Sequence, residues 1–422
     1  MLDTPQESKP FTSQVEVYYG TNRLPQPRII DALPGNSQVE IIEKLLACLA
    51  ALTIIGVWTF GLIRKQVVAY SAVAVACSLF LASLLGLRAI RITVPDDRQT
   101  VAYGTEHSNS VALGVCKVSI PETHLVGELE RPSIVRLEFE ENENKHIVLK
   151  ETQPLEADSF FERMRGAMDE RGDSLLVFIH GYNVSFEEAA RRTAQMAYDL
   201  RFPGAPVFYS WPSKDNWYQY QNDRRSIELS VGHMKRFLTQ LADRSGASNI
   251  HVIAHSMGNV GLTQALAELA PQEEPIFNQV VLAAPDIDAQ VFRDRIAPKI
   301  VDKVERCTVY TSMTDLALVA SRYFNAGSRI GEHALDQAIP GVDIIDASSV
   351  DTSLLGHSYY GEETVLGDLS EILLNRPLDR RTYVKTKLVA GTPYRFVDRP
   401  YMASASSSSK GAVDAVKDAV IR

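Results

Sequence analysis

Residues 250–260 read Ile-His-Val-Ile-Ala-His-Ser-Met-Gly-Asn-Val, an apolar run followed by a serine between small neighbours. The run has the composition of a buried strand, and a helix is expected to begin near Val260. Between them, Ala254-His255-Ser256-Met257-Gly258 matches the small-x-Ser-x-Gly pattern, in which a sharp strand-to-helix turn exposes a serine. The residues two before and two after the serine must be small, because larger side chains would collide with the neighbouring strand and helix. Alanine at 254 replaces the usual glycine and still fits.

Ser256 is therefore a candidate nucleophile. The alternative is a serine in an ordinary loop between a strand and a helix. A five-residue pattern of this kind arises by chance in many chains of this length, so the pattern alone is weak. The strand before the serine and the helix after it carry the argument, because they supply the structural context that the pattern requires.

Short apolar strands alternate with helices on both sides of this turn. We expect strands over residues 134–139, 146–150, 174–179, 207–211, 250–254, 279–283, 307–311 and 342–345. Apolar residues at helical spacing predict helices over 186–200, 227–244 and 260–269. Because the strands between helices are continuous apolar runs, we predict an α/β fold, with a mostly parallel sheet covered by helices on both faces.

A serine nucleophile in such a fold needs donors for the oxyanion that forms on the substrate. The backbone N–H of Met257, at the start of the following helix, is one candidate. The second is the N–H of Tyr182, in the turn His180-Gly181-Tyr182-Asn183 after an earlier strand. We interpret His180 as structural rather than as the base, because it precedes the serine and the base comes last on this type of scaffold.

The remaining members of a triad should follow the serine in the order acid, then histidine. Of the two later histidines, we favour His357, past the last expected strand, over His333, in a helix-like stretch before that strand. We favour Asp315 as the acid because it follows the strand over 307–311, and Asp286 and Asp288 are the alternatives. Such a triad needs neither a metal ion nor a cofactor.

Composition limits the other possibilities. The 422 residues carry 43 Lys and Arg against 52 Asp and Glu, a net charge of −9, which argues against a dedicated nucleic-acid-binding protein. The four cysteines have no short paired spacing of the kind that indicates zinc or a redox dithiol. With 45% hydrophobic and 23% charged residues, the chain is expected to fold.

Two membrane-length segments precede the catalytic motifs. Residues 45–63 and 67–87 contain no charged side chain, and only three residues join them, so we predict a transmembrane helical hairpin over 39–92. A pair of buried core helices is the alternative. Basic residues favour the flanks over the tip, which predicts that the domain after the hairpin lies on the cytoplasmic side of the membrane. The small residues of the second segment suit helix packing, and a homo-oligomer is one possible outcome.

Six stretches of the chain resemble one family: residues 18–23 (YYGTNR), 113–121 (LGVCKVSIP), 178–183 (FIHGYN), 209–213 (YSWPS), 254–258 (AHSMG) and 356–358 (GHS). They are similar to a bacterial α/β-hydrolase family of largely uncharacterised, esterase- and lipase-like proteins. The resemblance implies an α/β-hydrolase fold and a triad of Ser256, Asp315 and His357, and it gives no substrate. The hairpin then looks like a membrane anchor inserted into a loop of the hydrolase domain, and the resemblance implies a bacterial inner membrane with the hydrolase domain on its cytoplasmic side.

The expected organisation has four parts: residues 1–38 packing on the hydrolase domain, the hairpin over 39–92, the hydrolase domain over 93–400, and a Ser-rich tail over 401–422. We expect a membrane-anchored serine hydrolase that cleaves an acyl ester, with the bilayer as its partner and a lipid as one possible substrate. Trp211 and Trp217 are candidate substrate-binding residues, unless these aromatics pack against the following helix. The alternatives are a catalytically silent scaffold or sensor, and an acyltransferase or peptidase with the same triad.

Overall fold

The computed structural model describes residues 13–26, 29–31, 91–93, 101–133, 138, 141–214, 219–270, 274–312, 327–331, 339–348, 363–389 and 392–398. The two predicted membrane segments, the tail over 401–422, and Trp217, Asp315, His333 and His357 lie outside these residues. In the described ranges, no helix is both long enough and apolar enough to cross a membrane.

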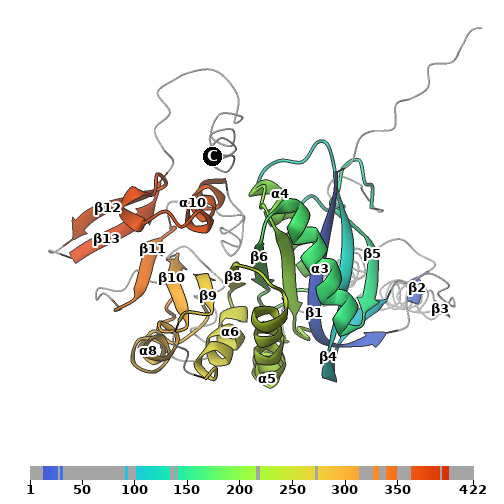
Figure 1. The fold of residues 1–422 in the computed structure, drawn as a ribbon, viewed down its shortest axis with the longest axis horizontal. Coiled ribbons are helices and arrows are strands. Elements are labelled where there is room, and N and C mark those ends of the chain that lie inside the picture. The colour runs from blue at the N-terminus through green and yellow to red at the C-terminus, as the bar shows by residue number, and fades with distance from the viewer. Residues whose placement is uncertain are drawn as a thin grey trace, which may run out of the picture.

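Eleven strands of the described residues form one sheet, seen in Figure 1. Seven neighbouring strand pairs, from β1 across to β13, are parallel, and β4, β5 and β12 are antiparallel to their neighbours. In spatial order the strands are β12 (Val384–Val389), β13 (Thr392–Val397), β11 (Val342–Asp346), β10 (Val304–Thr311), β9 (Phe277–Ala283), β8 (Asn249–His255), β6 (Ser174–Ile179), β7 (Ala205–Ser210), β1 (Ser13–Gln26), β4 (Ala102–Ile120) and β5 (Val148–Leu155).

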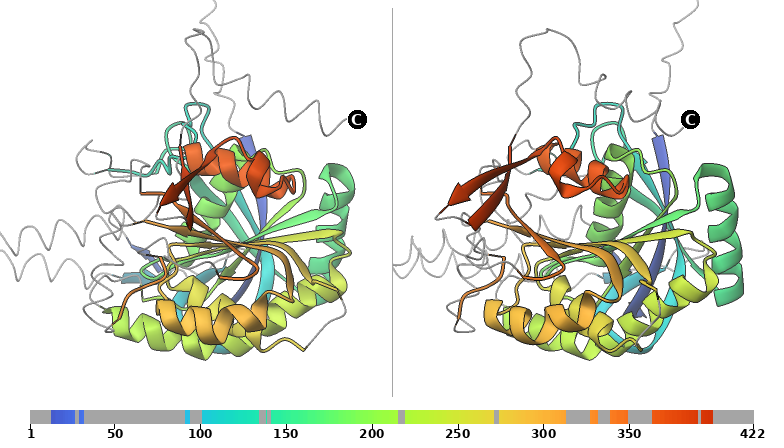
Figure 2. Two further views of the ribbon diagram at one scale, coloured as in Figure 1. Left: turned by 90° about the vertical axis from the view of Figure 1, so that its left-hand side faces the viewer. Right: turned by 60° about the vertical axis from the view of Figure 1, so that its left-hand side comes forward.

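Helices cover both faces of the sheet (Figures 1 and 2). One face carries α4 (Phe186–Asp199) and α10 (Glu363–Leu373). The other carries α3 (Ala157–Arg171), α5 (Tyr220–Arg244), α6 (Gly258–Ala267), and α7 (Ala289–Val291), which leads through a π-helical turn (Phe292–Ile296) into α8 (Ala297–Ile300). Successive strand residues point to opposite faces. Val177 and Ile179 therefore enter one hydrophobic core while Leu176 and Phe178 enter the other.

The predicted α/β fold with a mostly parallel sheet is confirmed. The strand predicted over 174–179 is β6, and those over 250–254, 279–283, 307–311 and 342–345 lie within β8 to β11. The prediction over 134–139 is wrong at residue 138, which is the one described residue of that segment and is not in a strand. Helix α5 begins at Tyr220, seven residues before the predicted start.

The N-terminal segment that was expected to pack on the hydrolase domain contains a strand of the sheet. β1 lies between β7 and β4, and it pairs with β4 from Ser13 opposite Ile120 to Gln26 opposite Ala102. A short ladder of β2 (Ile29–Asp31) with β3 (Arg91–Thr93) lies next along the chain and places Asp31 opposite Arg91. The chain therefore enters and leaves the segment over 32–90 at neighbouring positions.

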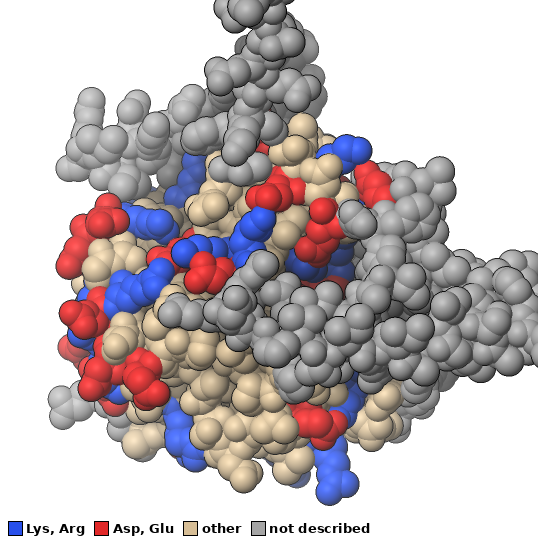
Figure 3. Space-filling model, turned by 90° about the vertical axis from the view of Figure 1, so that its right-hand side faces the viewer, with Lys and Arg blue, Asp and Glu red and all other residues tan. Residues whose placement is uncertain are grey.

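The surface on the β5 side of the molecule carries interspersed acidic and basic side chains, as Figure 3 shows. Ion pairs join neighbouring residues there, with Lys117 Nζ 2.8 Å from Glu151 Oε2 and Lys150 Nζ 2.6 Å from Glu143 Oε1. Exposed pairs of this kind each contribute little to stability, because water and salt screen them. This face is thus an ordinary solvated surface of mixed charge.

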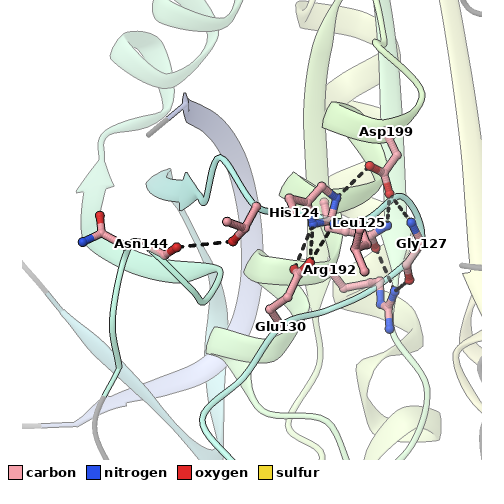
Figure 4. A network of polar contacts seen from close by, with 9 residues as sticks. His124, Leu125, Gly127, Glu130, Asn144, Arg192 and Asp199 are labelled. Atoms are coloured by element: carbon pink, nitrogen blue, oxygen red, sulfur yellow. Dashed lines mark hydrogen bonds and ion pairs between the residues drawn. The ribbon is translucent and has the colours of Figure 1, made fainter. Parts of the chain in front are cut away.

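The side chain of His124, which is 3% exposed, connects the loop after β4 to helix α4 (Figure 4). His124 Nδ1 lies 2.8 Å from Glu130 Oε2, and His124 Nε2 lies 2.8 Å from Asp199 Oδ1. Burial lowers the pKa of His124, but hydrogen bonds to Asp199 and Glu130 outweigh burial and raise it to about 9. The same two carboxylates accept the backbone N–H groups of Leu125 and Gly127. At neutral pH, the attraction between the protonated His124 and these two carboxylates therefore holds the loop against α4.

Candidate active site

Ser256 occupies a strained turn between β8 and α6. Its φ is 51°, in the left-handed region that residues other than glycine rarely adopt. The Ser256 N–H donates to the Ala283 carbonyl oxygen at 2.9 Å, and the Asn259 N–H donates to the Ser256 carbonyl oxygen at 3.1 Å. Neighbouring strand β9 and helix α6 therefore hold the turn in this conformation. The predicted strand, turn and helix around the serine are all present.

Glycine at position 258 is required by a close backbone approach. A Cβ atom at Gly258 would lie 2.4 Å from the His180 carbonyl oxygen and 2.9 Å from the Ile179 carbonyl oxygen. Both atoms are backbone at the end of β6, so they cannot rotate away as a side chain would. The collision that explains the small residue in the sequence pattern is thus with the neighbouring strand.

The turn after β6 packs directly against the Ser256 turn. A Cβ atom at Gly181 would lie 3.0 Å from Ser256 Cβ and 2.8 Å from His255 Nδ1. In the described part of the chain, neither the Tyr182 N–H nor the Met257 N–H donates to another residue. These are the two N–H groups that the sequence nominates as oxyanion donors, and both belong to turns beside the candidate nucleophile.

Hydrogen bonds from the neighbouring loop fix the backbone beyond Tyr182. The Asn183 N–H donates to Asp223 Oδ2 at 3.1 Å, and the Val184 N–H donates to Ser213 Oγ at 3.2 Å. Ser213 Oγ in turn donates to Asp223 Oδ2 at 2.5 Å. Burial raises the pKa of Asp223, and these hydrogen bonds oppose that rise. The buried carboxylate thus organises the turn that carries Tyr182.

The contacts of His180 are those of a structural residue. His180 Nδ1 lies 2.8 Å from the Gly181 carbonyl oxygen, and His180 Nε2 lies 3.2 Å from Ser210 Oγ. Burial, with a smaller contribution from the charge of Arg23, lowers the pKa of His180 to about 3. The ring is therefore neutral at neutral pH and is a poor proton acceptor.

Trp211 lies in the hydrophobic core, which corrects its interpretation as a substrate-binding residue. Its side chain is 0% exposed, and its indole stacks on the His180 ring with centroids 5.0 Å apart. The indole Nε1 donates to the His180 carbonyl oxygen at 2.8 Å. Trp211 thus packs in the interior against His180 and supports the turn after β6, whereas the alternative named packing against the following helix.

The alternative acids both have other contacts. The Tyr220 hydroxyl donates to Asp286 Oδ2, Arg329 Nε lies 3.4 Å from Asp286 Oδ1, and the Asp286 side chain is buried. The Asp288 carboxylate accepts the N–H groups of Gln290 and Val291 and so caps α7. Asp315 and His357 lie outside the described residues and stay the predicted acid and base, with Asp286 and Asp288 as the alternative acids.

The sequence analysis singled out residues 18–23 through the family resemblance, but it did not identify the buried hydrogen bonds that Arg23 makes. Arg23 is 1% exposed and donates to four oxygens that belong to Gly104, Val184, Ser210 and Ser213. Three of these residues lie beside the turn after β6 or at the end of β7 and just after it. The charged residue inside a β-branched and aromatic strand was the available signal, because arginine is almost never fully buried without partners.

In the described ranges, no group of three or more His, Cys, Asp or Glu side chains is placed to hold a metal ion. The groups beside Ser256 are instead the turn that carries Gly181 and Tyr182, and the backbone N–H of Asp286, which donates to the Ser256 carbonyl oxygen at 3.3 Å. Such an arrangement suits acyl transfer, in which charge develops on a carbonyl oxygen.

The match to a protein-family model agrees with this fold. The family described as alpha/beta hydrolase of unknown function (DUF900) matches residues 157–376, just over half of the chain. No curated protein matches the chain. Among solved structures, phospholipase PlaB from Legionella pneumophila aligns at 11% identity over 53% of this chain and 68% of that chain. Its TM-score is 0.28, which is too low to support an argument about structure or substrate. The matched residues include both turns beside Ser256, and the chain belongs to this family of alpha/beta hydrolases.

Proposed function

We propose that this hydrolase cleaves acyl esters through an acyl-serine intermediate on Ser256. The left-handed conformation of Ser256 is the observation that carries the proposal, because a strained serine in the turn between a strand and a helix is the geometry of the nucleophile in this motif. The N–H groups of Tyr182 and Met257, which donate to no residue in the described ranges, add the donors that such a reaction requires.

In the proposed reaction, Ser256 Oγ attacks the carbonyl carbon of the ester while His357 takes the hydroxyl proton. Asp315 orients the imidazole and stabilises the imidazolium. The N–H groups of Tyr182 and Met257 donate to the oxyanion of the tetrahedral intermediate. The intermediate collapses, the alcohol leaves with the proton from His357, and the acyl group stays on Ser256. Water activated by His357 then releases the acid.

Hydrolysis of a short soluble ester, such as p-nitrophenyl butyrate, tests this proposal with two serine variants. Ser256→Ala should lower kcat/KM by at least about 10³-fold, because the covalent route is lost. Ser248→Ala, an exposed position before the start of β8, is the matched control and should be unaffected. Equal activity of Ser256→Ala and wild type would reject the proposal, whereas a folded wild type without activity would favour a silent scaffold.

We further propose that residues 39–92 anchor the enzyme in the membrane through helices over 45–63 and 67–87. Two observations support the anchor. Neither segment contains a charged side chain, and each is long enough to cross the hydrocarbon core of a bilayer. The pairing of Asp31 with Arg91 in the β2–β3 ladder suits an insertion that leaves and rejoins the domain at one place. The distribution of basic residues favours the cytoplasmic face of a bacterial inner membrane.

The register of the sheet supports a substrate that lies in or at this membrane. Ala254, Ile179, Tyr209 and Gly20 form one row across β8, β6, β7 and β1, which are parallel neighbours. Ser256 directly follows β8 and is two residues past this row, and β1 continues six residues past the row to Gln26. Three strand spacings separate the two chains, about 14 Å. The chain therefore leaves β1 toward the proposed anchor at the carboxyl ends of the parallel strands, where Ser256 also lies. This favours a lipid or another acylated molecule of the membrane as the substrate.

A further inference from the structure

Arg23, Ser210 and His180 form a buried chain of hydrogen bonds that ends on the turn beside Ser256. Arg23 Nε donates to Ser210 Oγ at 2.8 Å, and Ser210 Oγ lies 3.2 Å from His180 Nε2. His180 Nδ1 lies 2.8 Å from the Gly181 carbonyl oxygen. The three side chains come from β1, the end of β7 and the end of β6, and all three are buried.

The chemistry of these groups fixes the direction of every hydrogen bond in the chain. A carbonyl oxygen can only accept, so His180 Nδ1 carries the proton and donates to Gly181. Because the ring is neutral, its Nε2 has no proton and accepts from the Ser210 hydroxyl. Ser210 Oγ accepts from the guanidinium of Arg23. Each group therefore donates to the next, starting from the positive charge on Arg23.

The last bond in the chain holds the peptide group that supplies the Tyr182 N–H. The Gly181 carbonyl and the Tyr182 N–H belong to the same planar peptide, and the described residues contain no cis peptide bond. In a trans peptide these two groups point in opposite directions. A carbonyl oxygen that is held against His180 thus turns the Tyr182 N–H away from that ring. Arg23 also binds the far end of the turn, where its Nη2 donates to the Val184 carbonyl oxygen at 2.8 Å.

We propose that Arg23, Ser210 and His180 are positioning residues that aim and polarise the Tyr182 N–H toward the oxyanion. This inference rests on the proposed acyl-serine reaction. Hydrogen bonds that run in one direction strengthen one another, most of all where water is excluded. A positive charge at the start of the chain therefore makes the Tyr182 N–H a better donor at the end. These hydrogen bonds connect Arg23, which is far from Ser256 in the sequence, to the turn beside Ser256.

The test uses Ser210→Ala, which removes the middle of the chain and keeps both Arg23 and His180. Ser230→Ala is the matched control, because Ser230 is also a buried serine that binds the same strand, through Asn22, but it does not contact His180. The substrate is p-nitrophenyl butyrate, and the second probe is a trifluoromethyl ketone, which forms a tetrahedral oxyanion on an active serine. Unfolding by urea is measured in parallel for both variants.

We expect Ser210→Ala to lower kcat by about 10- to 100-fold with KM within threefold, somewhat less than loss of a whole oxyanion donor. The inhibition constant of the ketone should rise by the same factor as kcat/KM falls, and Ser230→Ala should leave both unchanged. A folded Ser210→Ala with normal kcat, a change in KM alone, or a loss of kcat without weaker ketone binding would overturn the inference. Absence of activity in wild type would instead reject the proposed reaction.

A measurement on the unaltered protein covers the case in which Ser210→Ala does not fold. ¹⁵N NMR of the full chain, with histidine labelled, should show His180 as the neutral tautomer with its proton on Nδ1 from pH 5 to pH 8. A proton on Nε2, or a ring that titrates in this range, would overturn the inference, because the Ser210 hydroxyl could then no longer donate to His180.

Discussion

The backbone of Ser256 carries a cost that is separate from the chemistry of its hydroxyl. A residue with a Cβ loses about 1 kcal/mol or more in the left-handed conformation, whereas glycine does not. The φ of 51° should therefore be visible in stability as well as in activity. Both Ser256→Ala and Ser256→Gly remove the nucleophile, so a comparison between them isolates the backbone.

We predict that Ser256→Gly is more stable than Ser256→Ala by about 1 kcal/mol in the free energy of unfolding, measured with urea. Both variants should lack esterase activity. The same substitutions at Ser248, which has no positive φ, should rank in the opposite order, because glycine there only adds freedom to the unfolded chain. Equal stability of the two Ser256 variants would contradict the strained turn.

Individual residues differ in how far the sequence could predict them. Gly258 and Ser256 follow from a local rule of sterics, and the structure has the predicted turn. Trp211 could not be assigned, because a tryptophan after a strand can either line a pocket or enter the core, and only the packing against His180 decides. The role of Arg23 was hidden for a similar reason, since its partners lie 81 to 190 positions away in the sequence.

At the level of elements, the loop after β4 depends on the charge of His124. The raised pKa of about 9 means that the folded protein holds this proton more tightly than the unfolded chain, where the value is near 6.5. The stabilisation is therefore fully present below pH 6.5, and it is lost as the pH rises through about 9.

We predict that His124→Gln lowers the free energy of unfolding by about 1–2 kcal/mol more at pH 6 than at pH 10, since solvent screens part of the attraction. Urea unfolding of wild type and variant at both pH values gives this difference, and taking the difference removes the effects of other titrating groups. An equal loss at the two pH values would show that His124 acts through packing alone. Esterase activity at pH 7 is not expected to change. The loop follows the end of β4 that pairs with the start of β1, whereas Ser256 lies at the carboxyl ends of the parallel strands.

The strands that the sequence could predict are those that are buried on both faces. Strands β6 to β9 are buried along nearly their whole length, so they are largely apolar runs that stand out from the helices between them. β1 and β4 were not predicted as strands of the sheet. β1 contains Thr21, Asn22 and Arg23, which are polar and yet buried, because a network of hydrogen bonds from distant segments satisfies them. That network cannot be inferred from the composition of a short window.

At the scale of the whole molecule, the proposed anchor predicts which end of the domain approaches the bilayer: the end where the parallel strands have their carboxyl ends. Leu24 is 45% exposed near the end of β1, and it lies at the same end of the parallel strands as Ser256. Leu125 is 66% exposed in the loop after β4. It lies toward the opposite end of the domain, because the end of β4 pairs with the start of β1. From Ser13 to Leu24, β1 spans about 35 Å at its usual rise. The two leucines are thus a matched pair at opposite ends of the domain.

We predict that a spin label at Leu24→Cys is relaxed by a nickel-chelating lipid in vesicles that contain the full chain, and that one at Leu125→Cys is not. Cys48 and Cys77 are replaced by alanine first, while Cys116 and Cys307 are buried. Stronger relaxation at Leu125, or none at either site, would contradict an active-site edge that faces the membrane. Equal hydrolysis of an acyl lipid in the same vesicles and in separate vesicles would argue against a substrate from the enzyme's own membrane.

The central claim is that Ser256 is an activated nucleophile, and covalent labelling tests it most directly. The purified full chain is treated with a fluorophosphonate, digested, and mapped by mass spectrometry, with Ser256→Ala and His357→Ala alongside. We predict one phosphonylated peptide in wild type, which contains Ser256, and no label in either variant. A folded wild type that stays unlabelled in both detergent and vesicles, or a label on a different residue, would contradict the account.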